Sequence, residues 1–152
     1  MIRIVVIGAG GRMGKTIAAC IEDTEGVSLN GGTENAGHPA IGRDLGELAG
    51  IGKNEISIVE NIENALADCD VIIDFTTPES SIKTLDAALR CEKSIVIGTT
   101  GFSAEQKEII SQAAEKIRCV FAPNMSVGVN VLFKIAEDVS KTLGDAYDVE
   151  IV

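Results

Sequence analysis

Four glycines and one basic residue follow the first apolar stretch of the chain, in the segment GAGGRMG at residues 8–14. A glycine-rich turn between a strand and a helix is where a dinucleotide pyrophosphate binds, because the backbone there can approach the phosphates closely. The free amides at the helix start and the positive end of the helix dipole favour the phosphates, and Arg12 can add a full charge. The segment therefore predicts a dinucleotide site. The alternative is a glycine turn with a purely structural role.

An acidic residue, Glu34, ends the second predicted strand. A carboxylate at this point can accept hydrogen bonds from both hydroxyls of an adenosine ribose. It also repels a 2′-phosphate unless a neighbouring cation compensates, and its neighbour, Asn35, is uncharged. The alternative interpretation of Glu34 is an ordinary solvated loop carboxylate.

Small and polar residues stand at the carboxyl ends of three later predicted strands: DFTTP at 74–78, GTTG at 98–101 and APNM at 122–125. In an open α/β sheet, ligands lie beyond the carboxyl ends of the strands, so we expect the three segments to converge on one crevice. Such turns suit close approach of a nicotinamide and its ribose. Thr and Gly are equally typical of any strand-to-helix turn, which is the alternative for each segment.

Candidates for acid–base chemistry are few. The single histidine, His38, lies in a glycine-rich loop beside Pro39 and is interpreted as a surface residue. Asp70 and Asp74 flank one predicted strand and are interpreted as caps of turns. The sequence contains no nucleophile elbow, phosphate-binding P-loop or metal-ligand cluster. We therefore expect neither a catalytic residue nor a metal ligand among these residues.

The hydrophobic pattern predicts the elements that position these side chains. Apolar runs alternate with segments of helical period, which is typical of βα units wound around a parallel sheet. We expect an α/β fold of the Rossmann-like, doubly wound kind, with helices on both faces of the sheet. Predicted strands span residues 2–7, 27–33, 56–59, 71–75, 94–97 and 119–122. Predicted helices span residues 12–23, 45–49 and 62–67, and Met13, Ile17 and Ile21 are expected to face the core from the first of them. Two further helices are predicted to begin after Thr77 and Ser103, and a last one is predicted to end at Gly144.

Composition excludes several classes of protein. The 152 residues carry 13 Lys and Arg against 23 Asp and Glu, a formal charge of −10, and are 45% hydrophobic, as expected for a globular domain. No apolar run reaches the length of a membrane span or a signal-peptide core. The acidic charge and the scarcity of aromatic residues argue against nucleic acid as a partner. Four widely separated cysteines indicate buried, reduced thiols in the cytoplasm.

The last six residues, 147–152, alternate between apolar and acidic side chains, which is typical of a half-exposed strand. We expect this strand to begin a second domain that the chain does not complete. The predicted division is a dinucleotide-binding domain at 1–126, a connecting helix at 127–146 and the first strand of the second domain at 147–152. The alternative is an edge strand that simply ends the first domain.

Five segments together resemble one enzyme family: VIGAGGRMGKTI, GRDLGELAGIG, VIIDFTTPE, VIGTTGF and FAPNMSVGVNVLFKIAE. The chain resembles the bacterial dihydrodipicolinate reductases, also called 4-hydroxy-tetrahydrodipicolinate reductases, of the diaminopimelate and lysine pathway. The resemblance implies cofactor contacts at Gly8, Ala9, Gly10, Gly11, Arg12, Met13, Glu34, Gly98, Thr99, Thr100, Ala122, Pro123, Asn124 and Met125. Their positions at strand ends add Asn35, Phe75 and Thr76 as cofactor-binding candidates.

The resemblance also implies the reaction, which is hydride transfer from NADH or NADPH to the ring of a cyclic dicarboxylate. A histidine and lysine motif in the substrate domain would protonate that ring, and the chain ends before it. We therefore expect no reductase activity from the 152 residues alone, and activity from a full-length cytoplasmic parent. The resemblance further implies that the parent is a homotetramer assembled through its second domain.

Two positions depart from the family pattern. Many members carry a basic residue where Asn35 stands, so we expect NADH to bind at least as well as NADPH. Many carry Phe where Met125 stands, and the flexible thioether can still pack against a nicotinamide. Two alternatives remain: another two-domain oxidoreductase, such as a homoserine or sugar dehydrogenase, and a non-catalytic module that senses NAD(P). The GTTGF and APNMSVGVN segments argue against the first.

Overall fold

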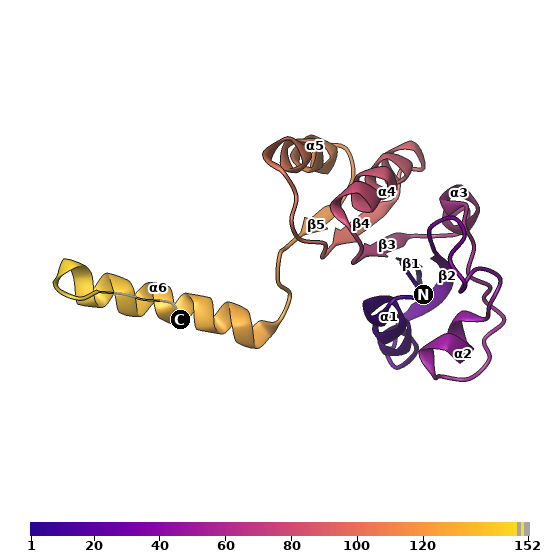
Figure 1. Ribbon diagram of the computed structural model, residues 1–152, viewed down its shortest axis with the longest axis horizontal. Helices are drawn as coiled ribbons and strands as arrows, with labels where there is room; N and C mark the ends of the chain where they lie inside the picture. The colour runs from indigo at the N-terminus through magenta and orange to yellow at the C-terminus, as the bar shows by residue number, and fades with distance from the viewer. Residues whose placement is uncertain (149, 151–152) are drawn as a thin grey trace. The chain divides into compact units, whose positions relative to one another are not determined.

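The computed structural model describes residues 1–148 and 150, in two units that are treated separately. The first unit, Met1–Phe121, is an α/β domain, and the second, Ala122–Val152, contains one long helix (Figure 1). The elements of the first unit are β1 (Ile2–Ile7), α1 (Arg12–Glu22), β2 (Val27–Thr33), α2 (Leu45–Ala49), α3 (Ile62–Leu66), β3 (Val71–Asp74), α4 (Pro78–Arg90), β4 (Ser94–Ile97), α5 (Ala104–Ala114) and β5 (Cys119–Phe121). The second unit holds α6 (Val127–Leu143) and the short 3-10 helix η1 (Gly144–Ala146).

The five strands form one parallel sheet in the order β2-β1-β3-β4-β5. From β1 the chain moves outward to β2 on one side, and then returns to place β3 on the other side. The strand order therefore reverses between β1 and β3, and open α/β sheets bind ligands at such a reversal. This arrangement confirms the predicted Rossmann-like α/β fold.

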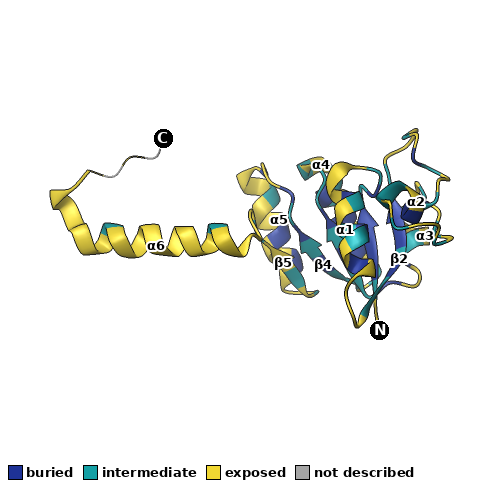
Figure 2. Cartoon of the chain, turned by 90° about the horizontal axis from the view of Figure 1, so that it is seen from below, coloured by how far each residue is buried: buried dark blue, intermediate teal, exposed yellow. Residues whose placement is uncertain are grey.

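The core lies on both faces of the sheet, because the side chains of β1 alternate between them. Ile4 and Val6 pack on the face covered by α1 and α2, whereas Val5 and Ile7 pack on the face covered by α3, α4 and α5 (Figure 1). Figure 2 shows the buried residues of the first unit on the strands and on the inner sides of the helices. A strand buried on both faces needs a continuous apolar run, which explains the sequence of β1.

The prediction of a strand at residues 56–59 is wrong. Only two isolated bridges occur there, a parallel one between Val59 and Thr33 and an antiparallel one between Ser57 and Asp44. The backbone hydrogen bonds of the segment are divided, since the Val59 amide donates to Gly32 in β2 while the Ile58 amide donates to Arg43 in the loop before α2. A segment that bonds in two directions cannot form a continuous ladder. Its place outside β2 is nevertheless that of the outer strand in the full Rossmann order 3-2-1-4-5-6.

The predicted inward stripe of α1 is partly wrong, because Met13 is 42% exposed. The helix instead buries Gly14, Ala18 and Ile21. A glycine at the contact lets the helix lie close to the sheet, which turns the neighbouring Met13 outward. Cys20 is also exposed on this helix, so the prediction that all four thiols are buried is wrong there.

In the second unit, α6 ends at its C-cap Gly144, as predicted. Its apolar positions, including Leu132, Ile135 and Val139, are exposed, and the helix has no buried residue. The predicted strand at 147–152 is not seen in the residues that are described, since Tyr147, Asp148 and Glu150 are in neither strand nor bridge. The remaining positions of that prediction, 149, 151 and 152, lie outside the described residues.

An ion pair ties β1 to β3 and makes a stability prediction possible. The Arg3 guanidinium donates to both carboxylate oxygens of Asp70, at 3.0 and 2.8 Å, and so holds the pKa of that carboxyl well below its usual range. A lowered pKa in the folded state stabilises the fold above the ordinary aspartate pKa of about 4, and this stabilisation is lost as the pH falls further. Asp70 therefore acts as a cross-strand anchor rather than as a turn cap.

We expect Arg3→Gln to lower the urea midpoint at pH 7 and to have a smaller effect at pH 3. Because both side chains are 40% exposed, solvent screening keeps the effect modest. Urea titrations of both proteins at the two pH values measure it. Arg118→Gln, at an exposed position in the loop before β5, is the charge-matched control. An Arg3→Gln effect that is equal at both pH values would contradict the assignment.

Candidate functional site

A crevice of about 360 Å³ opens at the carboxyl ends of β1, β2 and β3, where the strand order reverses. Three strand ends, the start of α4 and the segment before α3 line it. The lining residues are Ile7, Gly8, Gly11, Thr33, Glu34, Asn35, Glu60, Ile62, Phe75, Thr76, Thr77, Ser80, Lys83 and Thr84. The sequence predicted six of them as site residues, namely Gly8, Gly11, Glu34, Asn35, Phe75 and Thr76.

Glu34 reaches back over the glycine turn. Its Oε1 accepts a hydrogen bond from the Gly10 amide at 3.0 Å, and its Oε2 accepts one from the Asn35 amide at 3.2 Å. These bonds fix the carboxylate at the rim of the crevice rather than in solvent. A carboxylate aligned in this way is placed to accept the hydroxyls of a sugar that lies beside the turn.

The loop after Glu34 packs over the same turn. A Cβ on Gly10 would lie 2.7 Å from the Ala40 Cβ and 3.0 Å from the His38 Cε1, so no side chain fits between turn and loop. His38 is half-buried, and its Nδ1 accepts a hydrogen bond from the Ala40 amide at 3.2 Å. The interpretation of His38 as a surface residue is therefore wrong in part, because its ring holds this loop in place.

Among the α-helices in the described part of the chain, α1 alone begins without a side-chain cap. Its N-cap, Gly11, offers no side chain, so its first-turn amides have no side-chain acceptor. The other five α-helices begin at capping side chains, those of Asp44, Asn61, Thr77, Ser103 and Ser126. Helix-start amides without an acceptor, together with the positive end of the dipole, favour an anion.

Two glycines fix the distance between α1 and the sheet. Gly8 has a φ of +69°, a conformation that side chains disfavour, and turns the chain sharply after β1. A Cβ on Gly14 would overlap the Gly8 carbonyl oxygen and lie 2.6 Å from the Ala9 Cα. Because both obstacles are backbone atoms, no side-chain rotation relieves them. These glycines therefore place the start of α1 directly above the end of β1.

The turns after β3 and β4 lie against each other. Thr76 donates its amide hydrogen to the Thr99 Oγ1 at 2.8 Å. A Cβ on Gly98 would lie 2.6 Å from the Phe75 Cδ1, so the Phe75 ring occupies the space beside Gly98. Thr99 is 3% exposed and its hydroxyl faces the interior, whereas Thr100 is exposed. The structure thus brings two of the three predicted turns together.

The other predicted site residues are placed differently. Ala9 is fully buried, and its amide bonds to the Thr33 carbonyl at 3.0 Å, so it faces the core. Arg12 and Met13 are exposed in the first turn of α1 and do not line the crevice. The predicted APNM segment, which comprises Ala122, Pro123, Asn124 and Met125, belongs to the second unit. There the Asn124 side chain accepts a hydrogen bond from the Ser126 amide at 2.8 Å.

Sequence reasoning missed the far wall of the crevice. Ser80, Lys83 and Thr84 recur at helical spacing on α4, and the helix start predicted at Pro78 was a signal for that face. Lys83 is the only cation among the lining residues, which also include the carboxylates of Glu34 and Glu60. Glu60 was also missed, although its position at the carboxyl end of the predicted strand at 56–59 was a signal of the same kind as that of Glu34.

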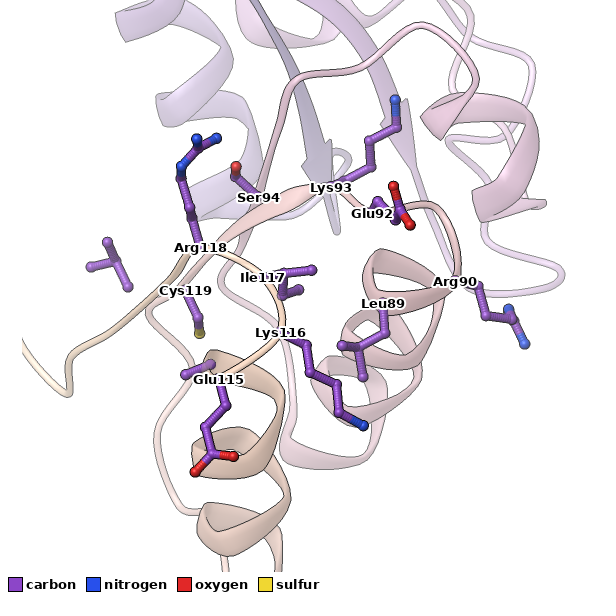
Figure 3. Close-up of a pocket in the computed structure, with 12 residues that line it drawn as sticks. Leu89, Arg90, Glu92, Lys93, Ser94, Glu115, Lys116, Ile117, Arg118 and Cys119 are labelled. Atoms are coloured by element: carbon purple, nitrogen blue, oxygen red, sulfur yellow. The ribbon is translucent and has the colours of Figure 1, made fainter.

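A larger hollow, about 1190 Å³, lies near the opposite ends of β4 and β5, beside the ends of α4 and α5 (Figure 3). Arg90, Lys93, Lys116 and Arg118 line it together with Glu92 and Glu115. Figure 3 shows these charged side chains pointing in different directions rather than toward one centre. Without converging polar groups, and at the amino ends of the strands, this hollow is a weaker candidate than the crevice.

The described residues offer neither a membrane span nor a metal centre. None of their helices is both long and apolar enough to span a bilayer. They also contain no group of three or more histidine, cysteine, aspartate or glutamate side chains arranged to hold a metal ion.

The reversal of strand order, the uncapped α1 above a glycine turn and the carboxylate at the end of β2 define a Rossmann-type protein of the dinucleotide-binding class. The family profile "Dihydrodipicolinate reductase, N-terminus" matches residues 2–125. The chain belongs to this family.

Curated relatives named 4-hydroxy-tetrahydrodipicolinate reductase align with the whole of this chain. The chain is 51% identical to a 4-hydroxy-tetrahydrodipicolinate reductase of Geotalea daltonii and 49% identical to that of Geotalea uraniireducens, in each case over all of this chain and 57% of the relative. The chain thus spans little more than half the length of these relatives. A solved structure, dipicolinate-bound dihydrodipicolinate reductase from Paenisporosarcina sp. TG-14, superposes with a TM-score of 0.71 at 27% identity, over 91% of this chain and 53% of that one.

Proposed function

We propose that this chain binds a nicotinamide dinucleotide in the crevice at the ends of β1, β2 and β3, as the cofactor half of a 4-hydroxy-tetrahydrodipicolinate reductase. The observation that carries the proposal is the contact between Glu34 and the Gly10 amide beside the uncapped start of α1. It supports a ribose acceptor and a phosphate-binding helix end on the same rim of the crevice. The names of the relatives supply the substrate class, a small cyclic dicarboxylate.

The residues present fit such a cofactor. The glycine turn leaves no Cβ between the backbone and a pyrophosphate, and the first-turn amides of α1 lack a side-chain acceptor. The protein's charge of −10 does not oppose this, because at physiological salt charges are screened beyond about 8 Å. The groups that line the site itself, the helix start and Lys83, favour the phosphates.

Each part of the crevice then has a separate task. The bound cofactor supplies a hydride for reduction of the ring of the dicarboxylate. The start of α1 holds the pyrophosphate, Glu34 orients the adenosine ribose, and α4 lines the same crevice through Ser80, Lys83 and Thr84. The turns after β3 and β4 hold the nicotinamide half, and Ala122–Met125 are assigned to the same half by the family resemblance.

We expect NADH to bind at least as tightly as NADPH, because Glu34 repels a 2′-phosphate and Asn35 offers no compensating charge. Isothermal titration of the chain with each nucleotide tests both the site and this preference. Adenosine itself is the control, since it lacks the pyrophosphate that α1 would hold. Absence of NADH and NADPH binding would contradict the proposed function, whereas markedly tighter NADPH binding would contradict only the preference.

The alternatives are less well supported. Membership of the reductase family does not favour a homoserine or sugar dehydrogenase, nor a module that senses NAD(P) without catalysis. The homotetramer and the action on the dicarboxylate are proposals for the full-length protein. Reductase assays and sedimentation of that protein test them.

A further inference from the structure

A buried carboxylate lies directly behind the crevice. Asp74, the last residue of β3, is 0% exposed. Its Oδ1 accepts three hydrogen bonds, from the Thr76 amide at 3.0 Å, from the Thr76 hydroxyl at 2.6 Å and from the Thr99 hydroxyl at 3.3 Å. The sequence-based interpretation of Asp74 as a turn cap accounts for the first bond only.

The Thr99 hydroxyl extends this cluster to the start of α4. Its Oγ1 accepts from the Ser81 hydroxyl at 2.8 Å and from the Thr76 amide at 2.8 Å while it donates to Asp74. Ser81 is 0% exposed and Thr99 3%. We call Asp74, Thr76, Ser81 and Thr99 the buried hydroxyl cluster. It joins three elements of the first unit: the end of β3, the first turns of α4 and the end of β4.

Stability alone does not account for a carboxylate at this position. Burial of a charge is costly, and apolar residues of similar volume often serve a core at least as well. Here the Asp74 Oδ2 has no hydrogen-bond partner among the described residues, so the side chain lacks part of the compensation that a buried polar group requires. The cluster instead fixes the relative position of the turns after β3 and β4, because several hydrogen bonds join them.

The two turns so joined are those that the proposed function assigns to the nicotinamide half. The cluster fixes residues 75–77 against residues 98–100, with the Phe75 ring seated beside Gly98. The exposed Thr100 follows Thr99 directly, so the bonds of the Thr99 hydroxyl determine where the Thr100 backbone stands.

We propose that Asp74 and Thr99 are positioning residues for the nicotinamide half of the cofactor, because their buried side chains hold the turn after β4 at a fixed distance from the turn after β3. The inference rests on the proposed function. It predicts that loss of the cluster weakens recognition of the nicotinamide half and leaves recognition of the adenosine diphosphate half intact.

The test compares NADH with ADP-ribose, which lacks the nicotinamide. We expect Thr99→Val, which removes the hydroxyl and keeps the shape, to weaken NADH binding about tenfold and ADP-ribose binding by less than about twofold. Thr99→Ser keeps the hydroxyl and should restore NADH binding to within about threefold of the original. If Thr99→Val does not fold, Ser81→Ala decides, with an expected NADH loss of about threefold and an unchanged ADP-ribose affinity.

The control for instability is Ile95→Val on β4, the strand that leads to Thr99. Ile95 is 1% exposed and makes no bond to the cluster, so the variant loses stability through packing alone. It should leave the ratio of the NADH and ADP-ribose affinities unchanged. Equal weakening of both ligands by Thr99→Val, or no weakening of NADH in the folded variant, would overturn the inference.

The unsubstituted chain separates this inference from the function on which it rests. If it binds neither ligand, the proposed function is wrong. If it binds ADP-ribose and NADH equally, the dinucleotide site stands but the nicotinamide half is not held, and the inference is overturned.

Discussion

Gly14→Ala is expected to abolish NADH binding and to lower the free energy of unfolding by about 1–3 kcal/mol, the usual cost of overpacking a well-packed contact. The added methyl group would overlap the Gly8 carbonyl oxygen and stand 2.6 Å from the Ala9 Cα. Since both are backbone atoms, α1 must move away from β1. The first-turn amides move with it, and the phosphate site loses its geometry. Urea denaturation and isothermal titration with NADH measure the two effects.

The control is the same substitution in a helix start without such a contact. Gly128 lies in the first turn of α6, where an added methyl group would have only the Ser126 Oγ within 4 Å, at 3.9 Å. Gly128→Ala should therefore stabilise α6 by about 1 kcal/mol through the higher helix propensity of alanine, because the added methyl group meets no close contact. If Gly14→Ala bound NADH within twofold of the original chain, close contact between α1 and β1 would not be needed for the site.

Glu34→Ala is expected to weaken NADH binding by at least about tenfold. Hydrogen bonds from ribose hydroxyls to a carboxylate are charge-assisted, and each contributes about 1.5–3 kcal/mol. Removal of the side chain also leaves the Gly10 amide without its acceptor at 3.0 Å. NADPH should lose less than NADH, because the same substitution removes the carboxylate that repels the 2′-phosphate. Titration with both nucleotides gives the two losses and their ratio.

Glu60→Ala provides the matched control for charge. Glu60 lines the same crevice and carries the same charge, but it is exposed and makes no hydrogen bond to the glycine turn. We expect it to change NADH affinity by less than about threefold. If Glu60→Ala and Glu34→Ala had equal effects, the role of Glu34 would be electrostatic only, and its assignment to the ribose would be wrong.

The crevice shows how an acidic protein can hold an anionic cofactor. Of the side chains that line it, two are carboxylates and one, Lys83, is a cation, so side-chain charge alone does not attract a pyrophosphate. Attraction comes instead from the backbone, through the amides and dipole of α1. A site of this kind depends on the position of the helix more than on the charge of any one residue. This is why the glycine that seats α1 carries the largest expected effect.

The amino-acid sequence by itself determined those elements whose signals are local. The apolar run of β1, the glycine turn after it, and the helix starts after Thr77 and Ser103 each depend on neighbouring residues, and all are confirmed. The strand ends followed from these elements, and the positions of Glu34 and Thr76 at the crevice followed from the strand ends.

Only the tertiary structure decided the rest, because the deciding contacts join residues far apart in the chain. Residues 56–59 have the composition of a strand, but their hydrogen bonds are divided between β2 and the loop at 42–45. Met13 has the spacing of a core residue, but close contact at Gly14 turns it outward. Thr99 has the position of a ligand contact, but its hydroxyl bonds to Asp74 and Ser81. Periodicity and spacing report which residues share a face, whereas the partner across that face is fixed only when the sheet and helices pack.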